Sequence, residues 1–143
     1  MNTIFCKRKF LPIAILTMIL FSNTNAGEVK ILAADFTRSA NNQWAVSVTL
    51  KHHDTGWDHY ADDWRVVDNK GNVLGNRVLY HPHVSEQPFT RSLSGVKIPP
   101  GLTQVYIEAH DKVHGWTPDR LAVDLRKADK GRLRVEAGQV TSQ

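Results

Sequence analysis

The chain has 143 residues and a formal net charge of +4, from 18 Lys and Arg against 14 Asp and Glu. The basic excess lies at the two ends, because residues 27–125 carry twelve acidic and ten basic residues, which argues against a nucleic-acid-binding surface. The only cysteine, Cys6, and the only methionines, Met1 and Met18, stand near the start. Beyond residue 18 the chain therefore has no disulfide, thiol nucleophile or soft sulfur ligand, and a bound metal would need imidazole and oxygen ligands.

The first 26 residues have the pattern of a secretory signal. Three basic residues, 7–9, precede an apolar run at 10–21, and small side chains stand at Thr24 and Ala26. The apolar run is too short to span a bilayer by itself, although an uncleaved anchor helix is the alternative. We expect cleavage after Ala26, a periplasmic or secreted protein without a membrane span, and a net charge of +1. Cys6 precedes the apolar run, so it cannot be the lipidated cysteine of a lipoprotein.

Strand patterns follow one another through the rest of the chain. A first strand is expected around residues 28–36, and "QWAVSVTLKH" (43–52) alternates cleanly between apolar and polar residues. A hairpin is expected over residues 63–80, because Asp68–Asn72 has turn chemistry between two β-rich runs. Further strands are expected in "FTRSLSGVKI" (89–98), "TQVYIEAHD" (103–111) and "DRLAVDL" (119–125).

No segment shows apolar residues at helical spacing. About seven short strands separated by turns predict an all-β protein, an antiparallel sandwich of the immunoglobulin or fibronectin type III kind. We expect this domain to span residues 27–126. Residues 127–143 form a polar, basic tail, for which the sequence leaves open both a mobile end and one extra strand at "RLRVEA".

All seven histidines lie between His52 and His114, in three groups that also contain acidic residues, and each group falls at a strand end or in a loop. In an immunoglobulin-like domain the first and third of these loops share one end of the sandwich. This clustering predicts one divalent metal ion, copper or zinc, as the single cofactor. The residues rated as ligands are His81, His83 and His110, then His59 and His114, with Glu86. The alternative is that these histidines only hydrogen-bond the loops.

Two tryptophans, Trp57 and Trp116, stand beside glycines in candidate loops and could stack on a sugar or peptide; the alternative is that they pack in the core. Arg91 could bind an anionic ligand, but a pairing with Glu86 or a nearby Asp is favoured. No nucleophile and base stand together in the sequence, so no catalytic residue is assigned. The leading hypothesis is an exported, non-enzymatic binding module; the alternative is a module that binds a partner protein in the envelope.

One stretch resembles the first metal-binding motif of the cupins. Gly75 is followed after five residues by His81 and His83, and then by Glu86. The spacing departs from the cupin pattern, because only two residues separate His83 from Glu86 and eight separate Glu86 from Gly95. Pro99-Pro100-Gly101 resembles the Pro-x-Gly of the second cupin motif, but no histidine follows at the expected distance. This resemblance implies a small β-barrel metalloenzyme as the alternative fold and function.

The segment "GWDHYADDWRVV", continued by "HPHVSEQPFTRSL", resembles an uncharacterised family of small bacterial proteins that carry signal peptides. The resemblance covers most of the chain after residue 26. It implies a periplasmic or secreted location and assigns no residue a role.

Overall fold

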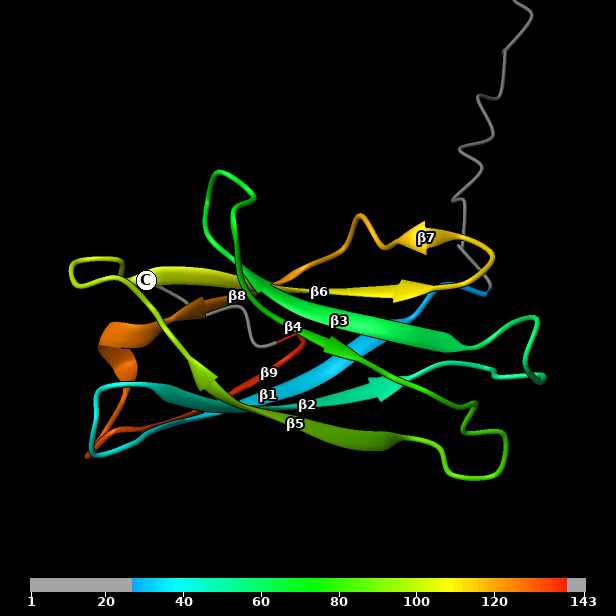
Figure 1. Ribbon diagram of the computed structural model, residues 1–143, viewed down its shortest axis with the longest axis horizontal. Helices are drawn as coiled ribbons and strands as arrows, with labels where there is room; N and C mark the ends of the chain where they lie inside the picture. Colours follow the sequence, from blue (N-terminus) through cyan, green and yellow to red (C-terminus); the bar gives the residue numbers. More distant parts are fainter. Residues whose placement is uncertain (1–26, 139–143) are drawn as a thin grey trace, which may run out of the picture.

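The computed structural model describes residues 27–138. The predicted signal peptide therefore lies outside the described residues. Nine strands in the described part form two antiparallel sheets that face each other (Figure 1). The first sheet has the order β5-β2-β1-β9, and its strands are β1 (Lys30–Arg38), β2 (Trp44–Lys51), β5 (Phe89–Val96) and β9 (Arg132–Glu136). The second contains β3 (Ala61–Val67), β4 (Val73–Val78), β6 (Gln104–Asp111), β7 (Gly115–Trp116) and β8 (Leu121–Asp124).

The strand order is that of an immunoglobulin-type sandwich. The chain crosses between the sheets four times, from β2 to β3, β4 to β5, β5 to β6 and β8 to β9, and β3 pairs with β6. β6 also pairs with β7 at its end and with β8 at its start. The predicted all-β sandwich is confirmed. The cupin-like barrel is wrong, because the two sheets stay separate over residues 27–138 and do not close into one.

Alternation along the strands builds the core between the sheets. In β2, Trp44, Val46, Val48 and Leu50 are buried, and in β6 every second residue from Val105 is buried in the same way. Trp64 of β3 packs fully buried among them. Burial of each such side chain contributes about 1.5–3 kcal/mol, so the inward residues hold the sheets together.

The turn between β3 and β4 forms as its sequence predicts. Asp68 accepts hydrogen bonds from the backbone N–H groups of Lys70 and Asn72, at 2.8 and 2.9 Å. Gly71 has a φ of +85°, a conformation that glycine adopts without the steric cost paid by other residues. In the tail, a 3₁₀ turn at Leu125–Lys127 leads to β9, which pairs with β1 at the edge of the first sheet.

Three loops gather at one end of the sandwich, the right-hand end in Figure 1: the β2–β3, β4–β5 and β6–β7 loops. Strands β2 and β6 both end here, and the histidine groups lie in or beside these loops. Within residues 27–138, no helix is long and apolar enough to cross a membrane.

Candidate metal centre at the loop end

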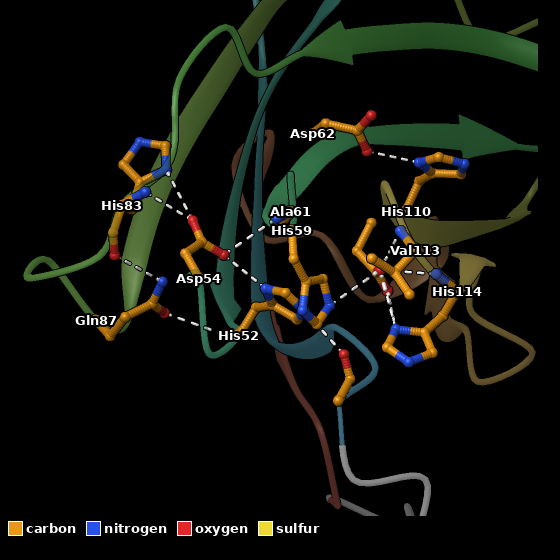
Figure 2. A network of polar contacts seen from close by, with 12 residues as sticks. His52, Asp54, His59, Ala61, Asp62, His83, Gln87, His110, Val113 and His114 are labelled. Carbon is orange, nitrogen blue, oxygen red and sulfur yellow. Dashed lines mark hydrogen bonds and ion pairs between the residues drawn. The ribbon is translucent and has the colours of Figure 1, made fainter. Parts of the chain in front are cut away.

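A buried carboxylate, Asp54, ties two of the three loops together. Its Oδ1 accepts from the backbone N–H of Ala61 at 3.1 Å and lies 2.6 Å from Nδ1 of His52. Its Oδ2 accepts from the backbone N–H of His83, in the β4–β5 loop, at 2.6 Å. The side chain of Gln87 adds a second link between the same loops, because it accepts from His52 N–H and donates to the carbonyl of His83 (Figure 2). The β2–β3 and β4–β5 loops are thus fixed relative to each other.

Both ring nitrogens of His52 have partners. Nε2 lies 2.8 Å from the backbone carbonyl of Gly27. A carbonyl only accepts, so Nε2 carries a proton. Nδ1 and Asp54 hold another proton between them across their 2.6 Å contact. A carboxylate that binds one imidazole nitrogen fixes the ring and leaves the opposite nitrogen to meet a ligand, as in carboxylate–histidine–metal sites.

A second buried carboxylate, Asp111, organises the β6–β7 loop. It accepts from the backbone N–H groups of Val113 and His114 at 2.9 and 2.8 Å, and its Oδ1 lies 3.0 Å from Nδ1 of His114. Burial alone would raise the pKa of Asp111, but these hydrogen bonds outweigh it and lower the pKa below its usual value. Asp111 is therefore an anion that holds His114 by Nδ1, as Asp54 holds His52.

His59 connects these two carboxylate–histidine pairs. Its Nε2 lies 3.4 Å from Oδ1 of Asp111 and makes no hydrogen bond within the described part of the chain. Its ring contacts the rings of His52 and His114, with centroids 4.8 and 5.1 Å apart. The predicted meeting of the first and third histidine groups is confirmed by these contacts, which Figure 2 shows at close range.

Three of these residues form a group that could hold a metal ion. One ligand atom from each of His52, His59 and Asp111 lies within 4.8 Å of the other two. Bonds of about 2.1 Å in a tetrahedral zinc site place ligand atoms about 3.4 Å apart. The widest pair would therefore have to approach by up to about 1.4 Å on binding.

The pair rated highest from sequence, His81 and His83, lies in the loop between β4 and β5 rather than on a strand. The two rings are 4.6 Å apart. His81 is exposed, whereas His83 is 4% exposed and stacks on Phe89 at 3.9 Å. Neither ring nitrogen of His83 has a hydrogen-bond partner among the described residues, although Nδ1 lies 3.9 Å from Asp54. Burial lowers the pKa of His83, and the charges of Arg91 and His81 lower it further.

The other residues singled out from the sequence have separate partners. Glu86 pairs with Arg91 at 3.1 Å, and this hydrogen bond lowers the pKa of Glu86. His110 lies 2.6 Å from Asp62 by Nδ1 and 5.0 Å from the ring of Trp116. The guanidinium of Arg65 covers Trp116 at 3.7 Å. Trp57 is 64% exposed and touches Tyr60 edge-on.

Two members of this group, His52 and Asp111, are not among the ligands predicted from the sequence. Each continues the inward alternation of its strand, His52 after Leu50 of β2 and Asp111 after Ala109 of β6. A polar residue at an inward position at the end of a strand or just past it is the signal that could have identified both. The contact with Gly27 has no such signal, because it depends on how the start of β1 lies against the loops.

Comparison with known proteins identifies a relative. The chain is 46% identical over 78 residues to a protein of Halomicrobium mukohataei described as "Putative lipoprotein". The match covers 54% of this chain and 38% of that protein, so this chain spans well under two thirds of its relative's length. No family model matches the chain, and no solved structure matches it. None of these comparisons indicates an enzyme family.

Proposed function

We propose that this protein is an exported β-sandwich that binds one divalent metal ion, copper(II) or zinc, at its loop end. The observation that carries the proposal is the group formed by His52, His59 and Asp111, whose ligand atoms lie within 4.8 Å of one another. Nitrogen and oxygen donors of this kind suit both ions. The signal pattern of residues 1–26 and the similarity to a protein described as a lipoprotein support export.

The surroundings of this group support ligation as well. Asp54 is 2% exposed and holds His52 by Nδ1, which leaves Nε2 as the ligating atom. A metal ion at Nε2 would replace the proton that now faces the carbonyl of Gly27. His59 already presents Nε2 toward Asp111 without a hydrogen bond in the described chain. Binding thus needs one proton released, an approach of the ligand side chains, and a shift of the Gly27 carbonyl, because 2.8 Å between Nε2 and that oxygen leaves no room for an ion about 2.1 Å from Nε2.

Metal analysis of untagged protein, followed by titration with copper(II) and zinc, tests this proposal. We expect about one equivalent per chain at micromolar metal. The His59→Gln variant should bind at least about tenfold more weakly, because it loses one of three ligands. The His53→Gln variant is the matched control, since His53 is exposed in the same loop and is not in the group. An absence of stoichiometric binding at micromolar metal would refute the proposal.

A second candidate function is docking of a partner protein in the cell envelope. Each of the three loops presents a large exposed apolar side chain at the same end: Trp57, Tyr80 and Val84, and Val113. Aromatic residues of this kind are enriched at protein interfaces. This function predicts that one envelope protein co-purifies with the chain, that chelation does not release it, and that Trp57→Ala does. Loss of the partner on chelation would assign the contact to the metal instead.

A further inference from the structure

The backbone of Gly27 lies between two histidines that carboxylates orient in the same way. His52 is held at Nδ1 by Asp54, and His114 is held at Nδ1 by Asp111. The opposite nitrogen of each ring, Nε2, faces Gly27. Nε2 of His52 lies 2.8 Å from the Gly27 carbonyl oxygen, and Nε2 of His114 lies 3.3 Å from where a Cβ on Gly27 would stand.

Gly27 is also the residue that the sequence makes the new start of the chain. Cleavage after Ala26, as the small residues at positions 24 and 26 predict, turns the amide nitrogen of Gly27 into a free α-amino group. That nitrogen is bonded to the same Cα as the carbonyl carbon, so it lies about 3 Å from the carbonyl oxygen. Export would thus place a new nitrogen ligand beside the histidines.

We propose that the α-amino group of Gly27, freed by signal cleavage, is a ligand of the metal ion held by His52 and His59. This inference rests on the proposed metal-binding function and extends it to a fourth ligand. The four ligands would then be three nitrogens and one carboxylate oxygen. Such a set suits the tetragonal geometry of copper(II), whereas structural zinc sites usually contain cysteine sulfur. Only the processed protein has the complete site, so metal binding follows export.

The identity of residue 27 fits this role. A Cβ at this position would lie 2.9 Å from Cε1 of His114, closer than side chains pack. Glycine therefore lets the start of the chain approach the two rings. In the precursor Gly27 has a φ of +121°, a second reason for glycine. Cleavage removes the preceding carbonyl carbon that defines φ, so in the mature chain only the close approach to the rings still requires glycine.

The test compares two exported proteins that differ only in where the amine stands. One is the natural precursor, processed to begin at Gly27. The other carries Gly-Ser inserted between Ala26 and Gly27, which keeps every histidine and an N-terminal amine but moves that amine two residues away. Intact mass establishes the N-terminus of each, thermal unfolding of the metal-free proteins compares their folds, and copper(II) titration with electron paramagnetic resonance reports affinity and nitrogen ligation.

We expect the protein that begins at Gly27 to bind one copper(II) at least about tenfold more tightly than the insertion variant, with one more nitrogen ligand in its spectrum. Equal affinity and identical spectra would overturn the role of the amine and leave the metal site standing. A natural N-terminus other than Gly27 would overturn it too. If neither protein binds copper(II) or zinc, the proposed function itself fails, and the role of the amine fails with it.

Discussion

The buried carboxylate of Asp54 should be among the most costly side chains to remove from this protein. Truncation in Asp54→Ala leaves three donors without their acceptor: Nδ1 of His52 and the backbone N–H groups of Ala61 and His83. Each buried donor left unsatisfied costs about 1–3 kcal/mol. Because these costs overlap at one site and the loops can relax, we expect a loss of about 3–5 kcal/mol from the free energy of unfolding.

Urea unfolding followed by tryptophan fluorescence measures this loss, since Trp64 is fully buried. With a urea dependence of about 1.5 kcal/mol per molar, the midpoint should fall by roughly 2–3 M. The Asp58→Ala variant is the control, because Asp58 is exposed in the same loop, and it should change the free energy by no more than about 0.5 kcal/mol. A free energy of unfolding for Asp54→Ala within about 1 kcal/mol of that control would show that Asp54 does not hold the loops in this way.

Two further predictions concern pH and the outer face of the second sheet. The pKa of His83 is lowered in the folded state, so the unfolded state binds more protons below about pH 6.5 and stability falls as the pH drops through that range. The His83→Phe variant lacks this titratable group. Between pH 7.5 and 5 its free energy of unfolding, from urea melts, should therefore fall less steeply than that of the unmodified protein, by up to about 1.4 kcal/mol per pH unit. Arg65→Lys should cost about 1 kcal/mol, because lysine cannot both stack on Trp116 and reproduce the 2.8 Å bond to Glu108.

Each of these has a result that would contradict it. For His83→Phe it is an acid profile parallel to that of the unmodified protein, which would mean that other groups cause the acid loss. For Arg65→Lys it is an unchanged midpoint of unfolding, compared with Arg77→Lys on the neighbouring strand β4 as control.

Alternation within single strands predicted most of the fold. Local sequence alone determines which residues of β2 and β6 point inward and where the turn at Asp68–Asn72 forms. Both features could therefore be predicted from the sequence. The two-residue strand β7 was not predicted, because it exists only through its pairing with the end of β6.

The site was harder to predict, because its members meet only after the sheets have packed. The close spacing of His81 and His83 suggested a shared ligand pair, yet burial places His83 against Phe89 and leaves His81 exposed. His52 and Asp111, by contrast, carry a visible mark as polar residues at inward positions. Their partners across the loops follow from the immunoglobulin-type strand order and cannot be deduced from spacing alone.

The most direct test of the metal centre is a crystal structure of the processed protein with copper(II) or zinc, with an anomalous difference map at the absorption edge of the metal. We expect one strong peak per chain, about 2.0–2.2 Å from ring nitrogens of His52 and His59, with Asp111 beside it. A peak at His81 and His83 instead, or no peak at a metal concentration well above micromolar, would contradict it.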